Sequence, residues 1–217
     1  MTRVKFFKIA PYPQVDYEKL IDALPSFIQE KVSKYKFQED RIRSAMGKVL
    51  LKNLLIEEGY PANILSQIKL DEFQRPFLNS TIDFNISHSG DYVICAIAKN
   101  NRVGIDIEKI NPLNIPDFEY ILTPDELRKL LIDKDAMPAF YKIWTQKEAV
   151  IKANGKGLGI NFTDIILDQE IAICENIKWN LTELHINYNY KSYIAVEKKD
   201  EINISELTID DLKEKPF

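Results

Sequence analysis

The order of the predicted secondary structure constrains this chain more than any other feature, because one plan occurs twice. A strand comes first, then segments with helical spacing of apolar residues, then short segments rich in β-branched and aromatic residues that predict strands. In the first part these are a strand at 4–10, helices at 16–35 and 39–58, and strands at 67–70, 82–86 and 92–99. In the second part they are a strand at 103–110, helices at 124–132 and 138–153, and strands at 163–167, 178–188 and 190–197. The plan predicts an α+β protein of two halves, residues 1–101 and 102–217, each with a small antiparallel sheet packed against helices.

Composition excludes several classes of protein. The chain has 217 residues, of which 45% are hydrophobic, so it can bury a sizeable core. Its formal net charge is −4 and its charges are interspersed, which argues against a nucleic-acid partner. No segment approaches an uncharged membrane span, so we expect a cytoplasmic protein with no membrane contact. The charged end after Lys198 predicts a solvated tail.

The segment Gly104-Ile105-Asp106-Ile107-Glu108 carries the strongest chemical signal. Alternate residues of a strand face opposite sides, so Asp106 and Glu108 are predicted to project together, away from a core that takes the two isoleucines. Two adjacent carboxylates repel each other unless water or a hard cation lies between them. Taken alone, the pair is as typical of any half-exposed strand as of a metal site. Removal of Asp106 is expected to relieve repulsion at little cost in stability.

A second signal is the helical segment WTQKEAVIK, in which Trp144, Glu148 and Lys152 recur every four residues and share one face. The pattern is compatible with a surface ion pair beside a core tryptophan. It is equally compatible with a carboxylate that binds a metal and a lysine that binds a phosphate. A lysine so close is expected to lower the pKa of Glu148.

A third signal is the segment FNISHSG, where His88 lies between two serines at a predicted strand-to-strand turn. Side-chain and backbone donors at such a turn can converge on an anion, although a turn histidine can also be purely structural.

Together and in this order, FNISHSG, GIDIEKI and WTQKEAVIKANGKGL resemble the motifs of the 4′-phosphopantetheinyl transferases. The resemblance is to the larger, single-chain, surfactin-synthetase-activating type, and it runs over residues 31–158. It implies two halves related by a pseudo-twofold axis, with coenzyme A bound in the cleft between them. It also implies an apo acyl or peptidyl carrier protein as the partner and Mg²⁺ as the metal. We expect a monomer, because one chain already supplies the whole cleft.

The resemblance also implies roles for individual residues. The metal ligands are Asp106, Glu108 and Glu148. The residues that bind coenzyme A are Lys31, Arg43, Arg75, Ser87, His88, Asp106 and Lys152. Lys31 and Arg43 are the candidates for its 3′-phosphate, and the segment 72–76 is the candidate for its adenine end. The chain departs from the family at Gln74-Arg75-Pro76, where a glycine and a lysine are common, and at Ile28, where a lysine is common. Lys34 is one candidate to replace that missing cation.

The reaction that the resemblance implies is attack by a carrier serine on the β-phosphorus of coenzyme A, with release of adenosine 3′,5′-bisphosphate. Glu148 and Lys152 are the predicted catalytic residues. Glu148 can serve as a metal ligand or as the base that takes the serine proton, and the sequence does not choose between them. The ligand role is favoured here, because a pKa lowered by Lys152 would make Glu148 a weaker base. Two other functions stay open at this point: a magnesium-dependent phosphodiesterase, and a non-catalytic module that binds coenzyme A or a carrier protein.

Overall fold

The computed structural model describes residues 1–9, 15–78 and 81–214. The helices are α1 (Tyr17–Asp22), α2 (Ser26–Ser33), α3 (Gln38–Glu57), α4 (Pro124–Leu131), α5 (Ala136–Asn154) and α6 (Ile209–Glu214). The first six strands are β1 (Thr2–Lys8), β2 (Lys69–Leu70), β3 (Pro76–Phe77), β4 (Ile82–Ser89), β5 (Tyr92–Lys99) and β6 (Val103–Lys109). The remaining strands are β7 (Ile166–Asp168), β8 (Ile171–Cys174), β9 (Ile177–Glu183), β10 (Tyr190–Val196) and β11 (Ile202–Glu206). Short 3₁₀ turns occupy Ile64–Gln67, Ile115–Ile121, Gly157–Gly159 and Phe162–Asp164.

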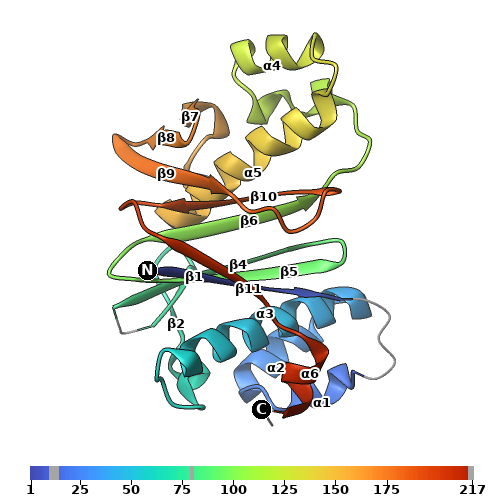
Figure 1. Cartoon of the computed structure of the whole chain (residues 1–217), viewed down its shortest axis with the longest axis vertical. Coiled ribbons are helices and arrows are strands. Elements are labelled where there is room, and N and C mark those ends of the chain that lie inside the picture. Colours follow the sequence, from blue (N-terminus) through green and yellow to red (C-terminus); the bar gives the residue numbers. More distant parts are fainter. Residues whose placement is uncertain (10–14, 79–80, 215–217) are drawn as a thin grey trace.

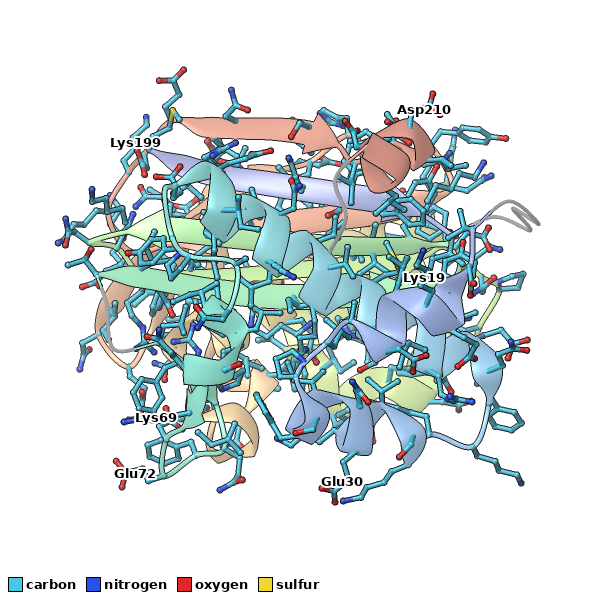
Figure 2. All side chains as sticks on the ribbon, turned by 90° about the horizontal axis from the view of Figure 1, so that it is seen from below. Lys19, Glu30, Lys69, Glu72, Lys199 and Asp210 are labelled. Carbon is cyan, nitrogen blue, oxygen red and sulfur yellow. The ribbon has the colours of Figure 1, made fainter. Side chains whose placement is uncertain are left out.

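The protein has four layers, with helices outside and two sheets between them (Figure 1). A core of apolar residues lies between the two sheets, formed by β1 and β5 on one side and by β6 and β10 on the other. A second core fills the space between the first sheet and α1, α2 and α3, and a third joins α5 to the second sheet. Seen from its helical side, α3 runs across the strands of the first sheet (Figure 2). The predicted α+β class is therefore confirmed.

The two sheets repeat one strand order, which gives the halves their likeness. In the first sheet the opening strand β1 pairs with β5, which pairs with β4; in the second the opening strand β6 pairs with β10, which pairs with β9. Each sheet is covered by one long helix, α3 or α5, that precedes the last strands. The division at residue 101 stays a prediction. Although β11 and α6 come after that residue in the sequence, they lie beside the elements of the first half (Figure 1).

The predicted solvated tail is wrong. Residues 202–206 form β11, which pairs in parallel with β1, so the first sheet is mixed rather than antiparallel. Leu207 follows and is 2% exposed, and Ile209 and Leu212 of α6 pack on the same core. Leu207, Ile209 and Leu212 therefore provide the burial that a tail lacks.

Other boundaries also differ from the predicted ones, two of them for a clear local reason. The helix expected at 16–35 is two helices, because Pro25 lies between them as the N-cap residue of α2 and has no N–H to continue α1. The strand expected at 163–167 opens as a 3₁₀ turn at Phe162–Asp164, and β7 begins only at Ile166. No helix in the described ranges combines the length and hydrophobicity needed to cross a bilayer.

Candidate active site

Strand β6 separates an apolar face from an acidic face, as its alternation predicts. Ile105 and Ile107 lie in the core between the sheets, whereas Asp106 and Glu108 point the other way, toward α5. Asp106 is only 2% exposed, so this carboxylate face is covered by protein rather than open to water. A buried carboxylate needs compensating partners.

Gly104 allows α5 to lie close against this face of β6. A Cβ atom at this position would lie 2.1 Å from the carbonyl oxygen of Ala149 and 2.3 Å from the backbone nitrogen of Ala153. Any side chain there would push the helix away from the strand. The glycine thus brings the α5 face that carries Glu148 and Lys152 within reach of Asp106, two residues further along β6.

The centre of the site is a hydrogen-bonded group of three side chains. Lys152 Nζ donates to Asp106 Oδ1 at 2.6 Å and to Ser87 Oγ at 3.0 Å, and Ser87 Oγ donates to the same Asp106 oxygen at 2.8 Å. Burial alone would lower the pKa of Lys152, but the charge and hydrogen bond of Asp106 outweigh it and raise the pKa. Lys152 is therefore held as a cation. Removing Asp106 would leave that cation without its ion pair, so the structure leads us to expect a larger cost in stability than the sequence did.

Glu108 and Glu148 lie around this group and are poorly stabilised as anions. Burial, with added repulsion from Asp106, raises the pKa of Glu108 to about 7, and Ser89 Oγ donates a hydrogen bond to its carboxylate at 2.8 Å. Burial also raises the pKa of Glu148, and Lys152 only partly opposes that rise. The predicted lowering of the Glu148 pKa is therefore wrong, because Lys152 is paired with Asp106 instead.

The edge strand β4 supplies the other wall of the site through side chains that sequence reasoning largely missed. Asp83, Asn85 and Ser89 accept hydrogen bonds from the backbone N–H groups of β6, at Val103, Ile105 and Lys109 respectively. Together with Ser87 they form a polar row at every second residue of β4. That alternation is visible in IDFNISHS and could have identified the row, although the sequence does not say which strand it faces.

His88 points to the other face of β4. It lies inside the strand rather than in the turn, which follows at Gly90. Desolvation, followed by the charges of Arg43 and Lys152, lowers the pKa of His88. Arg43 donates to the carbonyl of Gly90 at 2.9 Å and to Asp40 at 2.6 Å. These two predicted phosphate contacts therefore lie together, beside the central group rather than within it.

The two remaining predicted residues lie in different cavities. Arg75 is 8% exposed and donates from Nη2 to Asp83 Oδ2 at 2.9 Å and to the carbonyl of Val103 at 3.0 Å, so it ties the first half to β6. It borders a cavity of about 300 Å³ that Glu148 and Lys152 also line. Lys31 lines a separate cavity on the far side of Gln74.

The site contains the carboxylate oxygens that a hard cation prefers, but they do not surround a single point. In the described parts of the chain, no three metal-ligating side chains lie together as a ready-made metal site. Asp106 Oδ2 is nevertheless buried, and the described residues give it no hydrogen-bond partner; the charges of Asp106 and Glu148 both act on Glu108. A divalent cation would satisfy that oxygen and relieve the repulsion, so the residues fit such an ion.

Comparison with known proteins agrees with this geometry. Residues 102–202 match the 4′-phosphopantetheinyl transferase superfamily, and residues 11–100 match the 4′-phosphopantetheinyl transferase N-terminal family. The chain is 31% identical over 205 residues to the 4′-phosphopantetheinyl transferase gsp of Aneurinibacillus migulanus, which covers 86% of each protein. The chain belongs to the 4′-phosphopantetheinyl transferase family. It is also 32% identical to the transferase Sfp of Bacillus subtilis, over 69% of this chain and 68% of that one.

Membership in the transferase family confirms the resemblance predicted from three short motifs. It also separates the residues of WTQKEAVIK into two groups. Lys147 is fully buried and pairs with Glu126 at 2.6 Å and with the carbonyl of Ile121 at 2.8 Å, so it fixes α4 against α5. Glu148 and Lys152 are on the face toward β6. One motif thus carries both the support of the helix and the chemistry of the site.

Proposed function

We propose that this transferase moves the 4′-phosphopantetheine group of coenzyme A onto a serine hydroxyl of an apo acyl or peptidyl carrier protein. The observation that carries the proposal is the group of three acidic side chains around one fixed lysine, where β4, β6 and α5 meet. Such a group suits phosphoryl transfer, since it can hold a cation and a phosphate side by side. Family membership supports the same reaction.

Lys152 is proposed to bind the pyrophosphate of coenzyme A. Its hydrogen bonds to Asp106 and Ser87 fix the ammonium group before substrate arrives, so little ordering is required when the phosphate binds. As the bond between the β-phosphorus and the bridging oxygen breaks, negative charge accumulates on the leaving adenosine 3′,5′-bisphosphate. A cation held at that position stabilises the charge where it develops.

Glu148 is proposed to take the proton of the carrier serine as its oxygen attacks the β-phosphorus. Its raised pKa makes it a stronger base than an ordinary carboxylate. Among the described residues it has no hydrogen bond or ion pair that would have to break first. New oxygen–phosphorus bonding to serine, loss of the bridging bond and movement of the proton to Glu148 together balance the reaction.

Asp106, Glu108 and Glu148 are the residues that would hold Mg²⁺. When bound, the ion would withdraw charge from the phosphoryl oxygens and make the phosphorus easier to attack. The partner-free oxygen of Asp106 supports this assignment. A monomer in the cytoplasm remains the proposed state of the protein.

The proposal is tested by incubating the protein with an apo carrier protein, coenzyme A and Mg²⁺, and measuring the mass of the carrier. A gain of one phosphopantetheine group is expected, and a carrier whose acceptor serine is changed to alanine should gain nothing. Hydrolysis of coenzyme A without modification of any carrier would indicate a phosphodiesterase instead. Binding of coenzyme A without either reaction would indicate a binding module.

A further inference from the structure

A fourth residue, besides the glycine and the two carboxylates already described, belongs to the face of β6 that turns toward α5. It is Arg102, which comes one residue before the strand and two residues before Gly104. Residues at alternate positions of an extended segment share a face, so Arg102 continues the row of Gly104, Asp106 and Glu108. Neither the segment GIDIEKI nor the proposed reaction includes this arginine. Its side chain nevertheless reaches the helix that carries Lys152.

Arg102 binds the C-terminal end of α5 through two hydrogen bonds to the backbone. Its Nε donates to the carbonyl oxygen of Ala153 at 3.1 Å, and its Nη2 donates to the carbonyl oxygen of Asn154 at 2.7 Å. The last carbonyl groups of a helix have no partner within the helix, and they carry partial negative charge. A guanidinium group suits this position, because two N–H groups on one of its edges can bind two successive carbonyls.

The glycine that ends α5 makes room for this guanidinium group. Gly155 has a φ of 91°, in the left-handed region, and its N–H donates to the carbonyl oxygen of Ile151 at 3.0 Å. A Cβ atom at this position would lie 2.7 Å from Arg102 Nη2 and 2.9 Å from Arg75 Cδ. A side chain here would therefore strain the backbone and push Arg102 away from the helix end.

Arg102 is itself held by groups on both sides of β6. On one side, the backbone N–H of Glu197 donates to the Arg102 carbonyl at 3.4 Å, next to the ladder that joins β6 to β10. On the other side, Arg102 Nε lies 3.8 Å from Asp83 Oδ2 of β4. The same Asp83 oxygen accepts hydrogen bonds from Arg75 Nη2 and from the backbone N–H of Val103. The arginine therefore connects the end of α5 to a strand that is fixed by both halves.

The first half contains an equivalent arginine that binds its helix in a different way. Helices α3 and α5 cover the outer faces of the two sheets (Figure 1). Arg3, near the start of β1, reaches the C-terminal end of α3, but it pairs there with the side chains of Glu57 and Glu58. Long side chains can change rotamer, so this contact leaves the helix backbone free to shift. The contact that grips the backbone itself occurs on α5, the helix that carries Glu148 and Lys152.

The position of that backbone matters for the chemistry of the site. Ala153 and Asn154 follow Lys152 directly, so the two carbonyls that Arg102 binds lie within one turn of the lysine. Lys152 Nζ lies 2.6 Å from Asp106 Oδ1, and a small movement of the helix end would change this distance. A misplacement of about 1 Å in a catalytic group can cost about a hundredfold in rate.

We propose that Arg102 is a positioning residue for phosphopantetheine transfer, which fixes the C-terminal end of α5 so that Lys152 meets the pyrophosphate of coenzyme A. The proposal rests on the proposed function, which gives Lys152 its role in the reaction. Arg102 acts through the backbone of Ala153 and Asn154 and not by contact with the substrate. The two-donor geometry of the guanidinium group is required, and a positive charge at the helix end is not sufficient.

The substitution Arg102→Lys separates geometry from charge, because lysine keeps the cation at the helix end and loses the paired donors. Arg3→Lys is the matched control in the other half. Transfer is measured with coenzyme A, Mg²⁺ and an apo carrier protein. Arg102→Lys is expected to lower kcat by about tenfold or more, because Lys152 is misplaced in the transition state. The KM for coenzyme A should change by less than about twofold, since the other residues proposed to bind it stay in place. Arg3→Lys should match the wild type.

Two measurements distinguish positioning from a general weakening of the fold. In the background of Lys152→Ala, the change Arg102→Lys should have little further effect on the rate, because Arg102 acts through Lys152. Calorimetric titration with adenosine 3′,5′-bisphosphate counts the molecules that can bind substrate. Arg102→Lys should show the same number of binding sites as the wild type.

Hydrogen exchange tests the contact without any need for turnover. The amide of Gly155, which donates to Ile151, reports on the last turn of α5. In Arg102→Lys this amide is expected to exchange about tenfold faster or more, because the two carbonyls beside it lose a fixed partner. The amides in the middle of α5 should exchange as in the wild type, and Arg3→Lys should change neither region of α5.

The outcomes separate this proposal from the proposed function. A wild-type kcat in Arg102→Lys overturns the proposal, as does a loss of rate that is equally large in the Lys152→Ala background. A loss of rate matched by a loss of binding sites also overturns it. If the wild type modifies no carrier protein, the proposed function is rejected and hydrogen exchange alone decides. Faster exchange confined to Arg102→Lys then supports the fixing of α5 by Arg102, and unchanged exchange rejects it.

Discussion

Replacement of Glu108 by glutamine should make the protein more stable while it abolishes transfer. Glutamine has nearly the same shape, and its carbonyl oxygen can accept the hydrogen bond from Ser89. The substitution removes an ionised carboxylate from a half-buried position beside Asp106. Sites that bind cations commonly keep such unfavourable groups because function requires them.

The sign and size follow from the pKa of about 7 in the folded protein, compared with 4.5 in the unfolded chain. Below pH 4.5 the carboxyl is protonated in both states and contributes nothing. Between pH 4.5 and 7 only the unfolded chain ionises, so the stability of the folded state falls as the pH rises. Above pH 7 the penalty is constant, at most about 3 kcal/mol. Glu108→Gln should therefore match the wild type at pH 4 and exceed it by about 1–3 kcal/mol at pH 8.

Urea unfolding of both proteins between pH 4 and 8 measures this difference. Glu183→Gln provides a control of opposite sign. Burial disfavours the Glu183 anion, but hydrogen bonds from Lys191 and Tyr193 outweigh it and lower the pKa of Glu183. Its stabilising effect is present at pH 8 and is lost as the pH falls through the folded pKa, so this variant should be weakened at pH 8. A gain for Glu108→Gln that is independent of pH, or no gain at all, would refute the reasoning.

Three further changes have defined outcomes. Asp106→Ala should lower the free energy of unfolding by about 3 kcal/mol, because it leaves the Lys152 cation unpaired; an unchanged urea midpoint would contradict that pairing. Glu148→Gln should show background single-turnover rates throughout a Mg²⁺ titration, because an amide cannot accept the serine proton; recovery of the rate at high Mg²⁺ would assign Glu148 as a metal ligand only. Gln74 has a φ of 63°, in the left-handed region that favours glycine, so Gln74→Gly should raise the free energy of unfolding by about 0.5–1 kcal/mol; a lower free energy of unfolding would show that the side chain contributes more than the strain.

The parts of the site that the sequence predicted are those encoded by local periodicity. Alternation along β6 and four-residue spacing along α5 fix which side chains share a face, whatever the rest of the fold does. The acidic side chains of β6 and the side chains of Glu148 and Lys152 on α5 lie together because Gly104 lets the helix approach the strand. The joint position of Asp106, Glu108, Glu148 and Lys152 is a consequence of these local rules.

The parts that the sequence did not predict depend on partners far along the chain. Arg75 and Arg43 were recognisable as cations, but their pairing with Asp83 and with the Gly90 carbonyl depends on tertiary structure. The same holds for β11, whose parallel pairing joins residue 202 to residue 2.

The outer edges of β1 and β6 are equivalent in the two halves but have different neighbours. This difference explains why two similar halves produce one site of this kind. The outer edge of β1 is covered by β11 through a backbone ladder, which leaves no room for side chains between the strands. The corresponding edge of β6 faces β4, and there the side chains of Asp83, Asn85 and Ser89 take the backbone N–H groups instead. Two strands joined by side chains leave space between their backbones. Into that space Asp106 and Glu108 can turn, and Lys152 can reach them from α5.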